Sequence, residues 1–128
     1  MNNHEVVVQR AHPAQAPVAG SDYRIPAADV YETPDAFVLM LDLPGVVRES
    51  ISLTLEKGEM RVRADLKPLH LEEGTLLHSE MEGPGFFRVF SIGEGIDTAN
   101  VDARFEQGVL TVKLLKSEEI KPREIRIN

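Results

Sequence analysis

Short runs in which apolar and polar residues alternate constrain the fold of this chain more than any other feature of its sequence. From Ala27 onward such runs are separated by glycine and proline, as in "ISLTLE" (51–56), "MRVRAD" (60–65) and "VDARFE" (101–106). Successive side chains of an extended backbone point to opposite faces, so each run predicts a strand with one apolar face. No segment combines a 3.6-residue apolar period with helix caps over a sufficient length. The pattern therefore predicts an all-β fold, an antiparallel β-sandwich.

Three further apolar segments complete the expected set of strands. "AFVLMLD" (36–42) is apolar on both faces, which is typical of a strand covered from both sides, and "FFRVFSI" (86–92) and "VLTVKLL" (109–115) follow later. Lys57-Gly58 and Gln107-Gly108 each lie between two runs. Because glycine adopts positive φ at little cost, both pairs predict tight hairpins.

The length and composition limit the possible partners. A chain of 128 residues fits one domain with a single core. Its net charge of -7 disfavours nucleic acid as a partner, and the absence of cysteine excludes disulfides and thiolate chemistry. We find neither a signal peptide nor a membrane span, so the cytoplasm is the expected location.

Three regions follow from the distribution of residues along the chain. Residues 1–26 contain three prolines but no Phe or Trp, and we expect a flexible N-terminal arm; a linker or purification remnant is the alternative. Residues 27–116 are expected to form the sandwich domain. Residues 117–128 are expected to be a C-terminal extension.

One connection is too long for a hairpin. About twenty residues separate Asp65 from Phe86, and a structureless loop of that length usually has a function. Within it, "TLLHSEM" predicts another short strand, which can pair with its own sheet or with that of a neighbouring molecule. The residues of this segment are Thr75, Leu76, Leu77, His78, Ser79, Glu80 and Met81.

Residues that could support catalysis are sparse. The histidines at positions 4, 12, 70 and 78 lack the spacing of a helical zinc site. His70 with Glu72 and Glu73 could bind a divalent metal weakly, although a solvated acidic loop is the simpler interpretation. No G-x-x-x-x-G-K-[ST] stretch is present. We therefore expect no enzyme activity, no cofactor and no metal.

The end of the chain has the pattern of an anchor. Ile125 and Ile127 are spaced by two, so an extended backbone would direct both to one side. One interpretation is an edge strand of the chain's own domain. The other is an anchor that joins a sheet edge, possibly on a neighbour, and inserts two side chains into a groove.

Four stretches together resemble the small heat-shock proteins, over residues 27–127. They are "DVYETPDAFVLMLDLPG" (29–45), "PGVVRESISL" (44–53), "ARFEQGVLTV" (103–112) and the final "IRI" (125–127). The third contains the most recognisable signature of the family, formed by Ala103, Gly108, Val109 and Leu110.

The resemblance implies an immunoglobulin-like α-crystallin domain that dimerises, with dimers joined by C-terminal anchors into dynamic homo-oligomers. It implies that segment 75–81 is exchanged between subunits and that Arg88 lies near the dimer interface. The groove that accepts the anchor would be formed by Leu53, Leu55, Val101 and Ala103.

The implied activity is that of an ATP-independent chaperone, a holdase that binds unfolding proteins and limits their aggregation. Two other classes remain open. A co-chaperone-like adaptor would bind a folded partner as a monomer and would not need Ile125 or Ile127. A sugar-binding or hydrolytic sandwich would need aromatic platforms or buried carboxylates, and the chain has no Trp and two Tyr.

Overall fold

The computed structural model describes residues 22–67, 73–80, 83–118 and 127, and the structural statements below concern these residues. Seven strands form two antiparallel sheets, and a 3-10 helix (η1, Arg48–Ser50) precedes β3. The strands are β1 (Ala28–Glu32), β2 (Ala36–Asp42), β3 (Ile51–Glu56), β4 (Glu59–Asp65), β5 (Gly85–Ser91), β6 (Ile96–Glu106) and β7 (Val109–Lys116).

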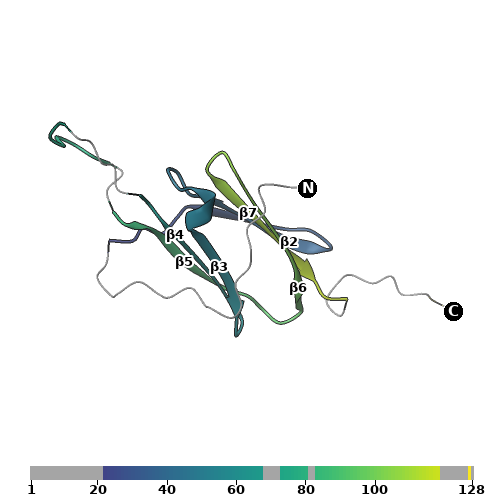
Figure 1. Ribbon diagram of the computed structural model, residues 1–128. Coiled ribbons are helices and arrows are strands. Elements are labelled where there is room, and N and C mark those ends of the chain that lie inside the picture. The colour runs from purple at the N-terminus through teal and green to yellow at the C-terminus, as the bar shows by residue number, and fades with distance from the viewer. Residues whose placement is uncertain (1–21, 68–72, 81–82, 119–126, 128) are drawn as a thin grey trace.

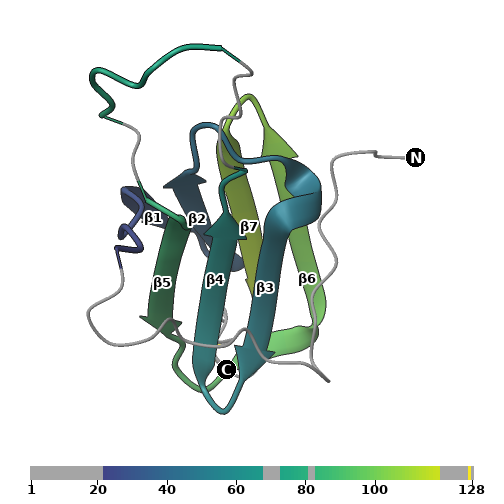
Figure 2. The same cartoon turned by 60° about the vertical axis from the view of Figure 1, so that its left-hand side comes forward.

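The two sheets pack as the layers of a sandwich. One sheet has the strand order β1-β2-β7-β6 and the other the order β3-β4-β5. Figure 2 shows the three-stranded sheet in front of the four-stranded one, with β3 beside β6 along one side. The predicted all-β sandwich is confirmed.

Alternate residues of the strands form the core between the sheets. On β4, Met60, Val62 and Ala64 are buried and lie opposite Leu55, Leu53 and Ile51 of β3 in the strand register. The inward residues of β7 are Leu110, Val112 and Leu114. The period-two pattern of these strands thus places one row of apolar side chains inside the sandwich, where burial stabilises the fold.

Both predicted hairpins are present. Gly58 has φ of 76° and Gly108 has φ of 78°, as expected for glycine in a tight turn. The preceding residues, Lys57 and Gln107, also have positive φ, at 50° each. Two consecutive positive values define the primed turn whose twist matches that of the flanking strands.

One expectation about the outer faces of the sheets is wrong. Met40 of β2 is partly exposed, so this strand is not covered from both sides in the single chain. Thr54 of β3 follows the polar alternation but is buried. Alternation predicts the face of a residue, whereas its depth depends on what covers that face.

Residues 73–80, in the middle of the long connection, lie away from the body of the sandwich (Figure 1). Its described central part, residues 73–80, forms no strand. The predicted strand over residues 75–81 is therefore not formed by residues 75–80 of the isolated chain, and Met81 lies outside the described residues.

Candidate functional site

Strands β3 and β6 each lie at the edge of a sheet, on the same side of the sandwich (Figure 2). Among the described residues, β3 pairs with β4 alone and β6 pairs with β7 alone. The outer edge of such a strand presents backbone N–H and C=O groups to an added strand. This pair of edges is therefore suited to binding an extended peptide.

The four residues predicted to form the groove differ in depth. Leu53 and Ala103 are fully buried and belong to the core, while Val101 is partly buried and packs against it. Leu55 lies at the end of β3, where it lines a surface cavity. Leu55 is also buried, at 7% exposure, so the structure places Leu53, Leu55 and Ala103 in the core, and of these three only Leu55 also borders the cavity.

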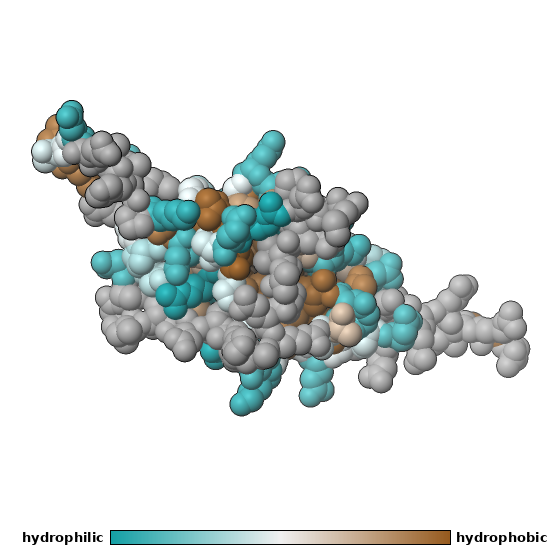
Figure 3. Space-filling model, viewed as in Figure 1, coloured by the Kyte–Doolittle hydropathy of each residue, from teal (hydrophilic) through white to brown (hydrophobic). Residues whose placement is uncertain are grey.

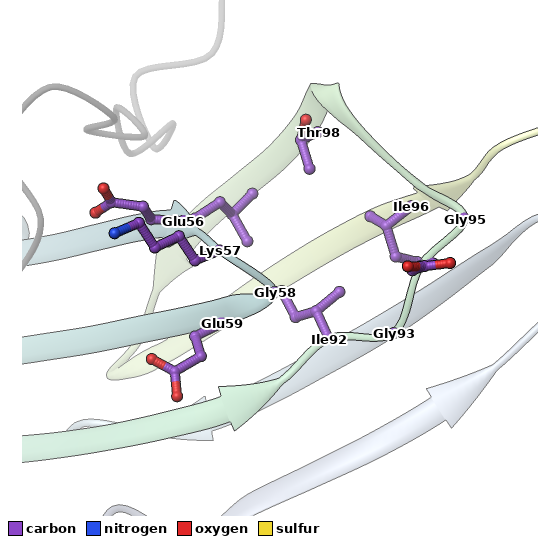
Figure 4. Close-up of a pocket in the computed structure, with 11 residues that line it drawn as sticks. Glu56, Lys57, Gly58, Glu59, Ile92, Gly93, Gly95, Ile96 and Thr98 are labelled. Atoms are coloured by element: carbon purple, nitrogen blue, oxygen red, sulfur yellow. The ribbon is translucent and has the colours of Figure 1, made fainter.

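The cavity beside Leu55 lies between the β3–β4 turn and the connection that leads into β6 (Figure 4). Its volume is approximately 320 Å³. Ile92, Ile96 and Thr98 point into this space, while the carboxylates of Glu56 and Glu59 lie on one side of it. The lining combines the apolar side chains of Leu55, Ile92 and Ile96 with three acidic residues, Glu56, Glu59 and Glu94, and one basic residue, Lys57. A partly apolar cavity with an excess of acidic residues suits an apolar side chain that is flanked by a basic one.

A bulge in β6 shapes the wall of the cavity. Ile96 pairs with Lys116 and Val101 pairs with Leu114, so residues 97–100 interrupt the register. The carboxylate of Asp97 accepts hydrogen bonds from the Ala99 N–H at 3.0 Å and from Asn100 Nδ2 at 2.7 Å. These local bonds stabilise the bend, where Ile96 and Thr98 line the cavity.

The projecting connection exposes two adjacent leucines. Leu76 is 70% exposed and Leu77 is 93% exposed, and Figure 3 shows apolar atoms at the tip of this segment. Exposed apolar side chains that are held away from the body of a domain are typical of an interaction surface.

Arg88, predicted to lie near a dimer interface, makes contacts within its own chain. Its Nη1 atom donates to the Pro26 carbonyl oxygen at 2.9 Å, and its guanidinium lies 4.8 Å from the centre of the Phe90 ring. These contacts fasten the segment before β1 to β5. Its role at an interface between subunits stays a prediction.

Lys116 is a buried charged residue, and its burial was not predicted from the sequence. Its side chain is 7% exposed, and Nζ donates to Glu32 Oε2 at 2.7 Å while lying 4.9 Å from the centre of the Phe37 ring. A buried ammonium group needs such partners to offset desolvation. Its spacing of two from Leu114 was the available signal, because the alternation places Lys116 on the core face.

The described residues offer little for catalysis or metal binding. Among them, no group of three His, Cys, Asp or Glu side chains is arranged to hold a metal ion. His70 and Glu72 of the weak candidate site lie outside the described residues. A hydrogen bond to Asp65 raises the pKa of Tyr23, and the same carboxylate raises the pKa of Arg63. No helix in the part of the chain that the structure describes is long and apolar enough to cross a membrane.

A seven-stranded sandwich with adjacent β3 and β6 edges and a long connection before β5 defines a domain of the α-crystallin class. The model of the Hsp20/alpha crystallin family matches residues 29–128. The chain therefore belongs to this family, the small heat-shock proteins.

Curated relatives and solved structures agree with this assignment. Spore protein SP21 of Stigmatella aurantiaca is 34% identical over 117 residues, which are 91% of this chain and 69% of that protein. The 18.3 kDa class I heat shock protein of Oxybasis rubra is 34% identical, over 94% of this chain and 74% of its own length. Heat shock protein 16.0 from Schizosaccharomyces pombe superposes with a TM-score of 0.67 at 28% identity, covering 81% of this chain and 98% of that one.

Proposed function

We propose that this protein is an ATP-independent holdase that binds unfolding proteins and limits their aggregation, and that it works as dimers joined into dynamic oligomers. The observation that carries the proposal is the cavity at the β3 and β6 edges, together with an isoleucine-bearing tail. A cytoplasmic location, non-native client proteins as partners and the absence of nucleic acid and membrane partners belong to the same proposal.

The tail has the chemistry of a reversible anchor. Ile127 is 90% exposed, while Ile125 lies outside the described residues. Burying one isoleucine contributes about 1.5 to 3 kcal/mol, and ordering one backbone residue costs about 1 to 2 kcal/mol. The net binding free energy of one tail is therefore small.

Several weak anchors acting in one assembly hold much more firmly. Once one tail has bound, the others bind as intramolecular contacts at a high effective concentration. An assembly of this kind opens one contact at a time, which suits a chaperone that must expose apolar surface and cover it again.

Arg126 lies between the two isoleucines and adds charge complementarity. The rim of the cavity contains Glu56, Glu59 and Glu94 against one lysine, Lys57; Glu59 is already paired with Arg61 at 3.0 Å, and the whole chain has a net charge of -7. A cationic side chain between two apolar ones is attracted to such a rim, with a strength that falls as salt screens the charges.

The projecting connection supplies the proposed contact between subunits of a dimer. In this proposal, residues 75–81 pair with a sheet edge of the partner and bury Leu76 and Leu77 there, close to Arg88. Among the described residues β1 pairs with β2 alone, so its outer edge is available to a strand from a second copy.

Suppression of aggregation requires only apolar surface that is exposed reversibly. Unfolding proteins present similar surface, and binding it before they meet each other prevents their association. The sequence has no nucleotide-phosphate loop, which agrees with an activity that needs no ATP.

Light scattering coupled to size-exclusion chromatography tests the assembly. We expect the native chain to be larger than a dimer, and the Ile125→Ala/Ile127→Ala variant to shift toward dimers. Ile25→Ala is a matched control because Ile25 is an exposed isoleucine outside the tail, at 75% exposure. If the native chain and the double variant are both monomers, assembly through the tail is wrong and the monomeric adaptor is favoured.

A heat-aggregation assay tests the activity itself. With an unrelated client protein and no nucleotide, the native chain should lower the light scattering of the heated client. Equal scattering with and without the chain, across several clients, would exclude the holdase.

A further inference from the structure

The segment before β1, Asp22–Pro26, runs beside β5 and is called the strap below. Arg24 forms a parallel bridge with Phe86. The Arg24 N–H donates to the Gly85 carbonyl at 2.9 Å, and the Phe87 N–H donates to the Arg24 carbonyl at 2.9 Å. The strap thus covers the first half of an edge strand that would otherwise present these groups to solvent.

A ring of three polar side chains fastens the strap to β4. The Tyr23 hydroxyl donates to Asp65 Oδ1 at 2.7 Å and accepts from Arg63 Nη2 at 2.7 Å. Arg63 Nε donates to the same carboxylate oxygen at 3.2 Å, and the guanidinium lies 5.0 Å from the centre of the Tyr23 ring. Each member of the ring is bound to the other two.

The strap also contacts both ends of the long connection. Asp65 is the last residue of β4, immediately before the connection begins. Near the other end, Arg24 Nη2 donates to the Glu80 carbonyl at 2.7 Å. Between these points the Leu66 N–H donates to the Pro84 carbonyl at 2.8 Å, which closes the base of the connection.

Polar contacts rather than apolar burial hold the strap in place. Pro26 is fully buried, but Ile25 of the strap is 75% exposed. The part of the strap before Pro26, residues 22–25, can detach without unfolding the sandwich, because its local opening requires chiefly that a few hydrogen bonds break. The ring is the side-chain contact that joins the strap to β4, and it acts together with the backbone bonds of Arg24.

We propose that Tyr23, Arg63 and Asp65 are positioning residues that lock the strap across the base of the connection and thereby set the direction in which Leu76 and Leu77 are presented. Their effect on a second copy of the chain rests on the proposed dimerisation. The lock itself is a property of the single chain and is tested without reference to assembly.

Amide hydrogen exchange is the first test. Tyr23→Phe removes the hydroxyl and keeps the ring, and Tyr31→Phe is the matched control because Tyr31 is the only other tyrosine and lies exposed on β1. Relative to the control, Tyr23→Phe should increase exchange about five- to hundredfold at the Arg24, Phe87 and Leu66 amides, as expected for the loss of the two hydrogen bonds of the hydroxyl group. Core amides of β7 should be unchanged.

The outcomes separate the two parts of the proposal. Unchanged exchange at Arg24 and Phe87 would overturn the lock. Faster exchange at these two amides with Leu66 unchanged would overturn the link to the connection. Exchange is measured in the Ile125→Ala/Ile127→Ala background at low protein concentration, so that assembly does not protect these amides. A failure of the proposed function is recognised separately, as a native chain that is monomeric.

The titration of Tyr23 reports the ring directly. In the Tyr31→Phe background Tyr23 is the only tyrosine, and its ionisation is followed by the absorbance of tyrosinate. Its pKa should lie above the ordinary value of about 10 and should fall when Asp65→Asn removes the accepting carboxylate. A Tyr23 pKa at the ordinary value in both proteins would overturn the ring.

Discussion

Replacing Gly85 by alanine should destabilise the fold strongly, because Gly85 lies where the strap, β4 and β5 meet. Its φ is +152°, and a Cβ atom built there would lie 2.0 Å from the Ala64 carbonyl oxygen and 2.8 Å from the Asp65 Cα atom. Both atoms belong to the backbone of β4, so no side-chain rotation relieves the contact. The added methyl group must separate the ends of β4 and β5.

The expected cost follows from these contacts. A residue held in an unfavourable backbone conformation costs about 1 to 3 kcal/mol. Separation of the strands also weakens the bond from the Arg24 N–H to the Gly85 carbonyl and the bond from Leu66 to Pro84, each worth about 0.5 to 1.5 kcal/mol. The free energy of unfolding should therefore fall by about 2 to 6 kcal/mol.

Urea unfolding at low protein concentration measures this difference. The measurement uses the Ile125→Ala/Ile127→Ala background, so that assembly through the tail does not contribute to the apparent stability. Gly93→Ala is the matched control, because no atom lies within 4 Å of its built Cβ atom. A change of less than about 0.5 kcal/mol for Gly85→Ala, similar to that of a surface substitution, would refute the reasoning.

Three further predictions concern the connection, the buried lysine and the strap. Leu76→Asn/Leu77→Asn should weaken dimers with little change in the unfolding temperature, because both side chains are exposed in the single chain. Sedimentation of the dilute protein measures the dimer fraction of this double variant. The control is Val47→Asn, which changes an exposed apolar residue outside the connection. Lys116→Met should be neutral or stabilising, because an apolar side chain of similar volume replaces a desolvated charge. Glu32→Gln, which leaves Lys116 without its carboxylate partner, should lower the free energy of unfolding by about 1 kcal/mol. This figure is reduced because Glu32 is largely exposed. Thermal unfolding compares the two variants. A Lys116→Met protein that is clearly less stable than the Glu32→Gln protein would contradict the prediction. Because the folded pKa of Tyr23 is raised, its contribution to stability should be fully present below about pH 10 and lost as the pH rises through the raised value; an unfolding free-energy difference between wild type and Tyr23→Phe that persists far above pH 10 would contradict it.

Much of the fold could be predicted because its information is local. "ISLTLE" and "AFVLMLD" coincide with β3 and β2, since alternation places one face of each in the core. The hairpins at Gly58 and Gly108 followed from turn chemistry, which depends on neighbouring residues alone.

The remaining features depend on contacts between distant residues. Tyr23 meets Asp65 across 42 positions, and Lys116 meets Glu32 across 84. The same limit applies to the predicted groove, where Leu53 and Leu55 share a face but only Leu55 lines the cavity. Which residues of one face become reachable depends on where the two sheets separate, and alternation does not encode that position.

Binding of the isolated tail tests the central claim most directly. A peptide with the sequence "KPREIRIN" would be titrated into the full-length Ile125→Ala/Ile127→Ala variant and followed by NMR, with the peptide in which both isoleucines are alanine as control. We expect weak binding, with a Kd of about 1 mM, and shifts centred on Leu55, Ile92 and Ile96, which line the cavity, and on Val101 of the predicted groove. Equal shifts with the alanine peptide, or shifts confined to the β1 and β5 side of the sandwich, would contradict the account.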